Sequence, residues 1–327
     1  MNNTKILITG GTGFLGENLY SHLLKCGYQS ENIYYDFYDQ FPYDGVDFSD
    51  PIQTDHIINH YKPDIVISLA AQVGGILKNI SDPYGFLYNN VMIQSTVINA
   101  CVKHKVKKVI NLASSCMFPK DFSVLKEEDL LQGSLEPTNL GYALAKIVGL
   151  KLGEYANKQF DSNIITLSPT NLYGPHSHFD LESSHALSAL ILKAYNCIKN
   201  NDDYIVVFGD GTAKREWLYV EDMCDAITFA IDNIEKPDTF FNVGVGNDIQ
   251  MNSLALTIIA FMKSKMNYTK DIHIVNDVSK PSGMQRKLLD VSKMKQLGWT
   301  AKTDFDNGLN KTIDWFLEMR LTDEMDG

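Results

Sequence analysis

The chain opens with a short apolar run that leads directly into three regularly spaced glycines. Residues 5–9 read Lys-Ile-Leu-Ile-Thr, which is typical of a buried parallel strand. Gly10, Gly13 and Gly16 follow, and leucines then recur at four-residue intervals up to Gly27. This spacing is typical of an amphipathic helix that ends at a glycine. A strand, a glycine turn and a helix in this order predict the first unit of an α/β fold with a parallel sheet.

The glycine turn also indicates a ligand site. A helix that begins just after it presents free N–H groups and the positive end of its dipole, and the glycines let a pyrophosphate approach the backbone. The alternative is a turn that only packs the helix onto the sheet. Strands and helices alternate up to about residue 173. This context favours the ligand site and predicts a Rossmann-type, doubly wound parallel sheet.

The end of the second predicted strand, residues 32–35, bears on the cofactor. Asp36 follows this strand, about 20 positions beyond the glycine motif, where an acidic residue binds the ribose diol of NAD. Asp36 could instead be a turn residue, since Asp39, Asp44 and Asp47 follow nearby. Both interpretations remain open at this point.

Two later strands carry polar side chains to the sheet edge where ligands collect. Residues 63–71 and 106–112 read as buried strands, and the second delivers Ser114 and Cys116 to its carboxyl end. The loop over residues 118–139 is long for a compact domain, which indicates a functional cover.

A tyrosine and a lysine follow this loop in a predicted helix. Tyr142 and Lys146 are four residues apart, so a helix places both side chains on one face. The lysine cation favours the phenolate, and Ser114 can hold a substrate oxygen, so the three residues can transfer a proton. A Tyr-x-x-x-Lys spacing is weak by itself; it gains weight from the dinucleotide site predicted before it.

The regular alternation is lost after residue 174, which predicts a smaller, interleaved C-terminal α/β substrate domain. We expect residues 1–173 with about 213–246 to form the NAD(P)-binding domain. Residues 174–212 with 247–327 are expected to form the nucleotide-sugar domain.

The charge and the cysteines exclude several classes of protein. A net charge of −11, from 40 acidic and 29 basic residues, disfavours binding to nucleic acid or to an anionic membrane surface. It leaves room for a local basic pocket that binds a small anion. Five scattered cysteines without Cys-x-x-Cys spacing predict reduced thiols in a cytoplasmic protein and no metal site. Neither a signal peptide nor a membrane-spanning apolar run is expected.

Several longer motifs between Ala70 and Trp299 carry a family resemblance. They lie at residues 70–76, 114–120, 130–139, 142–147, 169–176, 215–219 and 280–290. With these motifs the chain resembles the extended short-chain dehydrogenase/reductases and, among them, the GDP-L-fucose synthases. That family reduces and epimerises GDP-4-keto-6-deoxy-mannose.

The resemblance implies a role for each catalytic candidate. Tyr142 would protonate the C4 oxygen as hydride reaches C4, Lys146 would lower the pKa of Tyr142 and hold the nicotinamide ribose, and Ser114 would bind the C4 oxygen. Cys116 and His185 match the pair that removes and returns protons at the carbons next to the ketone. The structural alternatives are a buried strand-end thiol for Cys116 and a first-turn helix residue for His185.

The motifs and the resemblance together give two sets of candidate binding residues, and no metal is expected. The cofactor set is Gly10, Gly13, Phe14, Leu15, Gly16, Asp36, Asp47, Phe48, Ala70, Ala71, Tyr142, Lys146, Pro169, Asn171 and Leu172. The substrate set is Val73, Ser115, Asn171, Lys193, Arg215, Trp217 and Lys280. Arg215 and Lys280 match GDP-contacting positions, which would give an acidic protein a basic pocket. Trp217, like Tyr219, also fits an aromatic contact between domains.

The chain departs from the family pattern at two places. The family's arginines that grip the 2′-phosphate of NADP are replaced here by Thr12 and, near the second place, Asp36. A carboxylate repels that phosphate, so these residues favour NAD(H) over the family norm, NADP(H). Two adjacent arginines after His185 are replaced by Leu192 and Lys193, and a lysine keeps charge without bidentate geometry. The sugar, hexose or heptose, therefore stays open.

Three functional hypotheses follow, with a GDP-linked sugar as the expected partner and a homodimer expected from the resemblance. The leading hypothesis is a GDP-4-keto-6-deoxy-mannose-type epimerase/reductase. The alternative is an NAD-dependent GDP-manno-sugar 4-dehydrogenase or 4-reductase without epimerase activity. The third, a non-catalytic nucleotide-binding scaffold, is disfavoured because Ser114, Tyr142 and Lys146 are all present.

Overall fold

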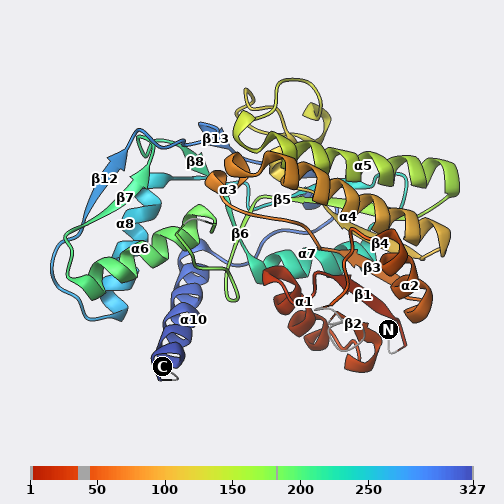
Figure 1. Cartoon of the computed structure of the whole chain (residues 1–327), viewed down its shortest axis with the longest axis horizontal. Helices are drawn as coiled ribbons and strands as arrows, with labels where there is room; N and C mark the ends of the chain where they lie inside the picture. The colour runs from red at the N-terminus through yellow and green to blue at the C-terminus, as the bar shows by residue number, and fades with distance from the viewer. Residues whose placement is uncertain (1–2, 36–44, 182, 326–327) are drawn as a thin grey trace.

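A six-stranded parallel sheet forms the centre of the computed structural model, which describes residues 3–35, 45–181 and 183–325. The strand order is β10-β5-β4-β3-β1-β2, and every neighbouring pair is parallel. This arrangement confirms the predicted Rossmann-type sheet (Figure 1). The strands are β1 (Ile6–Thr9), β2 (Ile33–Tyr34), β3 (Ile65–Ser68), β4 (Lys108–Leu112), β5 (Ile164–Pro169) and β10 (Phe240–Val243).

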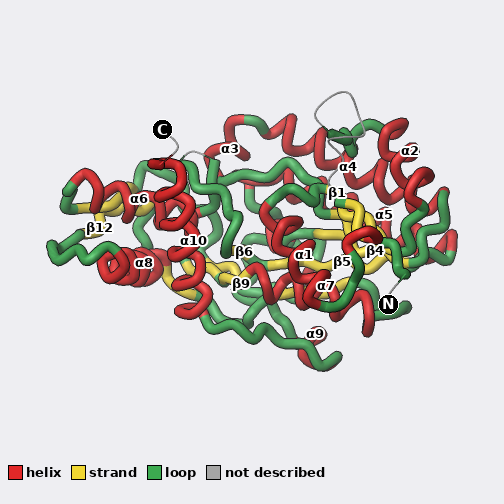
Figure 2. Tube along the Cα trace, turned by 90° about the horizontal axis from the view of Figure 1, so that it is seen from below, coloured by secondary structure: helices red, strands yellow, loops and turns green. Residues whose placement is uncertain are grey.

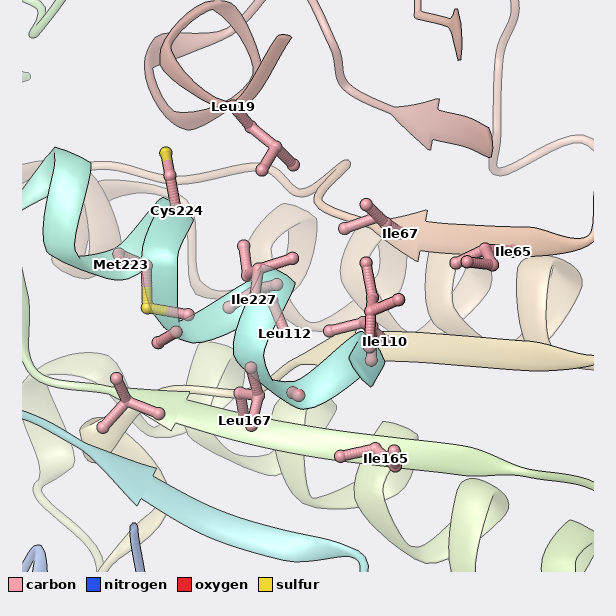
Figure 3. Close-up of a cluster of buried hydrophobic side chains, with 14 of the residues drawn as sticks. Leu19, Ile65, Ile67, Ile110, Leu112, Ile165, Leu167, Met223, Cys224 and Ile227 are labelled. Carbon is pink, nitrogen blue, oxygen red and sulfur yellow. The ribbon is translucent and has the colours of Figure 1, made fainter. Parts of the chain in front are cut away.

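Helices cover both faces of the sheet because alternate strand residues point to opposite sides. Ile6 and Ile8 pack with α1 (Phe14–Lys25) and α7 (Val220–Asn233) in one core. Leu7 packs in a second core on the other face, with α2 (Pro51–Tyr61), α4 (Pro83–Lys103) and α5 (Leu140–Phe160). Figure 3 shows the first core, where Met223 and Ile227 of α7 lie among strand side chains and Leu19 of α1.

The order of the strands reverses between β1 and β3, since the chain passes from β1 to β2 on one side and then to β3 on the other. Ligands bind at the carboxyl ends of the strands beside such a reversal. The glycine turn follows β1 directly, so the fold places it at this point.

A second group of elements lies beyond the sheet, as Figures 1 and 2 show. Its core joins α6 (Ala186–Asn200), α8 (Met251–Lys265) and α10 (Phe305–Met325) with the parallel pair β7 (Tyr204–Phe208) and β12 (His273–Asp277). Trp299 and Met294, which come late in the chain, pack back into the first core. The predicted division into two interleaved domains stays a prediction.

Short strands join the two groups of elements. β6 (Asn171–Tyr173) pairs with β9 (Trp217–Tyr219), and β8 (Lys214–Arg215) lies between β11 (Ile249–Gln250) and β13 (Arg286–Lys287). A single bridge connects Leu125, in the long loop, with Leu289. The loop itself holds the short 3₁₀ turns η3 (Ser115–Met117), η4 (Glu127–Asp129) and η5 (Pro137–Asn139).

Some elements begin or end where the sequence did not predict. A further helix, α3 (Ile76–Ser81), precedes α4, and α6 begins at Ala186, so His185 caps this helix and lies outside its first turn. Within the described ranges, no helix is both long and apolar enough to cross a membrane.

Candidate active site

A cavity of about 650 Å³ lies along the carboxyl ends of the sheet strands and extends to the second group of elements. It brings together most of the residues predicted from sequence. Those that line it are Gly10, Gly13, Phe14, Leu15, Gly16, Ala70, Ala71, Val73, Ser114, Ser115, Cys116, Tyr142, Lys146, Pro169, Asn171, Leu172, His185, Lys193, Arg215 and Trp217.

The remaining predicted residues lie elsewhere. Asp47 and Phe48 line an adjoining cavity of about 500 Å³ that begins at the same glycine turn and includes Tyr35. Lys280 lines neither cavity and its side chain is exposed, whereas its neighbour Pro281 lines the large one. Asp36 lies outside the described residues, so its predicted contact with the ribose stays a prediction.

The glycine turn has the shape that a pyrophosphate requires. Gly10 adopts a positive φ of 68°, and a Cβ there would lie 2.9 Å from the backbone of Ala70. A Cβ at Gly16 would collide with the carbonyl group of Gly11. Helix α1 begins immediately after Gly13 and points its N-terminal end into the turn. A dinucleotide therefore fits at these residues, with the diphosphate at the helix end.

Tyr142 and Lys146 lie on α5, as the four-residue spacing predicts. The Lys146 side chain is only 3% exposed; its Nζ donates to the Leu112 carbonyl oxygen at 2.7 Å and lies 5.6 Å from the centre of the Tyr142 ring. Burial lowers the pKa of Lys146 to about 8. Burial also raises the pKa of Tyr142, although a hydrogen bond with Ser114 opposes the change. Tyr142 therefore holds its proton at neutral pH and can act as an acid.

Cys116 sits on η3, just beyond the end of β4. Its backbone N–H donates to Ser114 Oγ at 3.2 Å, and Lys287 Nζ donates to the Cys116 sulfur at 3.2 Å. Burial alone raises the pKa of the Cys116 thiol, but the charge of Lys287, hydrogen bonds from Ser114 and Lys287, and the charge of Arg215 outweigh it. The pKa of Cys116 is lowered as a result, which distinguishes it from an inert buried thiol.

His185 reaches the same cavity from the N-terminus of α6. Its pKa is lowered, first by burial and then by the charge of Lys287. The imidazole is therefore neutral at neutral pH, a form that can accept a proton.

The far wall of the cavity carries hydrogen-bond donors for an anionic ligand. Lys193 Nζ donates to the Val206 carbonyl oxygen at 2.8 Å, and Arg215 Nη2 donates to the Ser282 carbonyl oxygen at 2.6 Å. Trp217 is 6% exposed, and its Nε1 is buried without a hydrogen-bond partner among the described residues. Such a donor is satisfied when a ligand accepts from it.

Sequence reasoning missed Lys287, whose Nζ donates a hydrogen bond to the Cys116 sulfur at 3.2 Å. Lys287 lies inside the motif at residues 280–290, but within that motif the resemblance implied Lys280 as the binding residue. The register of β13 against β8 places Lys287, and not Lys280, beside Cys116. This register cannot be predicted from the sequence. No group of three or more possible metal ligands occurs in the described part of the chain.

The fold and the site together define an NAD(P)-dependent enzyme of the short-chain dehydrogenase/reductase type. Its glycine turn can cradle a dinucleotide, and its Ser, Tyr and Lys side chains gather at the carboxyl edge of the sheet. The chain belongs to the NAD dependent epimerase/dehydratase family, whose model matches residues 6–244.

The most similar relatives act on GDP-linked sugars, according to their names. The chain is 37% identical to GDP-L-colitose synthase from Yersinia pseudotuberculosis over 325 residues, which cover 98% of this chain and 100% of that protein. It is 40% identical to GDP-L-fucose synthase from Escherichia coli (strain K12) over 264 residues, or 78% and 80% of the two chains. These identities confirm the predicted resemblance.

A solved structure supports the same relationship. A GDP-mannoheptose C4 reductase from Campylobacter jejuni with NADP bound matches this fold with a TM-score of 0.84 and 27% identity. The match covers 97% of this chain and 99% of that one.

Proposed function

We propose that this protein reduces C4, and epimerises C3 and C5, of a GDP-4-keto-6-deoxy sugar of the manno type. The observation that carries the proposal is that Ser114, Tyr142 and Lys146 share one cavity with Cys116 and His185. The first three residues suffice for a reductase, and the last two are needed only for epimerisation.

The nicotinamide cofactor would supply the hydride, and the chain would supply the protons. Ser114 holds the C4 oxygen, and Tyr142, whose pKa is raised by burial, donates its proton to that oxygen. The Lys146 ammonium stabilises the phenolate left behind. This order of events fits ketone reduction, in which the tyrosine must begin as the acid.

Epimerisation uses the acidity that the C4 ketone gives to the hydrogens on C3 and C5. Cys116 and His185 remove and return these protons. Arg215 binds the GDP portion, and Lys280 remains a predicted GDP contact. Lys193 and Trp217 remain predicted substrate contacts.

We also propose that NAD(H) is the preferred cofactor, because Thr12 and Asp36 replace the arginines that the family uses for the 2′-phosphate. NADP is present in the related heptose reductase structure. The preference rests on the sequence at these two positions alone.

The test is incubation with GDP-4-keto-6-deoxy-mannose in D₂O, with and without reduced cofactor. We expect deuterium at C3 and C5 without cofactor, and a reduced product with it. Tyr142→Phe should slow reduction by at least about 10²-fold and keep the exchange, because it removes only the acid. Cys116→Ser should suppress the exchange.

One departure from the family's sequence pattern supports a second candidate function. Leu192 and Lys193 stand where the family carries two arginines, so the sugar pocket differs. Hydride transfer without any deuterium incorporation would make the protein a GDP-manno-sugar 4-reductase or 4-dehydrogenase, with a heptose among the sugars to examine.

We propose a homodimer that acts in the cytoplasm, in polysaccharide biosynthesis. The support for a dimer is a stripe of exposed apolar side chains, repeated at three- and four-residue intervals on the packed pair α4 and α5. We call it the α4–α5 stripe; its residues are Tyr84, Leu87, Tyr88, Leu144, Val148, Leu152 and Tyr155. The support for the cytoplasm is that all five cysteines are free thiols.

A further inference from the structure

Two cations face each other where β8 and β13 pair. Lys287 is the register partner of Arg215 in this parallel pair, so both side chains leave the same face of the small sheet. Like charges in directly opposed positions destabilise a sheet. An anion close to both side chains would offset this repulsion.

Cys116 lies close to both cations, Lys287 and Arg215. Lys287 is 8% exposed, and the only hydrogen bond of its side chain in the described part of the chain goes to the Cys116 sulfur at 3.2 Å. No carboxylate among the described residues lies within ion-pair distance of Lys287. A buried ammonium without a counter-charge is costly, and a thiolate on Cys116 supplies that charge.

The other titratable groups around the sulfur do not provide the anion. Arg215 adds positive charge, and among the described residues the acidic groups that act on it are Cys116 and Glu136. Burial and the positive charge of Lys287 favour the neutral form of His185. Tyr142 is favoured in its protonated form, partly because a negative charge on Cys116 disfavours the phenolate.

We propose that Lys287 is a positioning residue that keeps Cys116 as a thiolate in the resting site, which makes Cys116 the base that opens each epimerisation. In this step the C–H bond next to the ketone breaks, its electron pair enters the enolate, and the proton moves to sulfur to form the thiol. His185 takes up a proton from solvent and gives it to the opposite face of the enolate, and the thiol releases its proton to solvent to restore the thiolate. The role of Cys116 as a base rests on the proposed function; the thiolate itself does not.

The thiolate is measured without substrate by the pH dependence of iodoacetamide alkylation, followed at each cysteine by peptide mass spectrometry of the full chain. Exposed Cys26 is an internal reference with a raised pKa. Buried Cys101 reports unfolding. The variants are Lys287→Met and Lys287→Arg, with Lys214→Met as the control that removes an equal charge from the exposed position beside Arg215.

In the wild type we expect Cys116 to react at a lower pH than Cys26. At a pH below the Cys116 midpoint of both proteins, Lys287→Met should slow alkylation of Cys116 by at least about tenfold, since there one pKa unit changes the thiolate fraction tenfold. Lys287→Arg should restore most of the rate because it keeps the charge, and Lys214→Met should leave it unchanged. If Cys101 becomes reactive in Lys287→Met, the test is the alkylation midpoint of Cys116 against that of Cys26 in the wild type.

An alkylation midpoint at Cys116 that matches Cys26, or that Lys287→Met leaves in place, would overturn the proposal. If that happens while deuterium still enters C3 and C5, epimerisation stands and the thiolate pair fails. If the midpoint is low and depends on Lys287 but no deuterium enters, the pair stands and epimerisation fails.

Discussion

Individual side chains decide which reaction this cavity supports. The sequence predicted the positions of Ser114, Tyr142 and Lys146 because each follows from strand ends and helical spacing, which are local properties. It could not identify the partner of Cys116, because Lys287 is distant in the chain and its placement depends on strand register. Local sequence patterns predict the proton-transfer group, whereas the charges around Cys116 become known only from the folded structure.

The cofactor preference is a prediction about one residue. Isothermal titration of the cofactor-free protein should show NADH binding more tightly than NADPH by at least about fivefold, since a carboxylate near a phosphate costs about 1 kcal/mol even in water. Asp36→Asn should narrow this difference, and Thr12→Arg should raise the affinity for NADPH. Tighter binding of NADPH to the wild type would contradict the prediction.

At the scale of elements, one buried carboxylate holds together the strands that carry the cations. Glu216 lies between β8 and β9 and is fully buried. Its Oε1 accepts from the backbone N–H groups of Val245 and Gly246 at 2.6 Å, and its Oε2 accepts from that of Leu289 at 3.0 Å. The carboxylate thus fastens the segment after β13 to the end of β10.

Glu216→Gln should lower the free energy of unfolding by about 2 kcal/mol, because an amide NH₂ faces at least one buried N–H donor and leaves it without an acceptor. Urea unfolding followed by circular dichroism measures the change. The control is Glu221→Gln on α7, whose carboxylate is half-exposed and pairs with Lys25, and which should cost less than about 1 kcal/mol. If the two substitutions lowered the free energy of unfolding equally, Glu216 would not stabilise the contact between these strands.

Elements differ in how well the sequence predicted them. Strand and helix patterns in the first 173 residues have runs of apolar residues at regular periods, and the sheet strands β1, β3, β4 and β5 follow them closely. The pairs β8 with β13 and β6 with β9 contain only two or three residues per strand. Such strands are too short to show a period, so their pairing is set by tertiary contacts such as those of Glu216.

For the whole molecule, the α4–α5 stripe predicts self-association. Light scattering of the wild type should give the mass of a dimer. Val148→Glu with Leu152→Glu should raise the dissociation constant by at least about tenfold, because the interface would bury two unpaired charges. Leu256→Glu, an exposed site on α8, is the control and should leave the mass unchanged. A monomeric wild type would contradict the proposal.

The bridge between Leu125 and Leu289 has a consequence for the order in which a newly made chain becomes complete. Asn242, on β10, donates to the carbonyl oxygens of both Leu125 and Asp290, so a loop from the first half of the chain is closed by residues from the last fifth. Domains fold largely from the N-terminus as the ribosome delivers them. The glycine turn, Tyr142 and Lys146 are therefore synthesised well before Lys287, the residue that contacts Cys116. The contact between Lys287 and Cys116 can form only after the last fifth of the chain has been made.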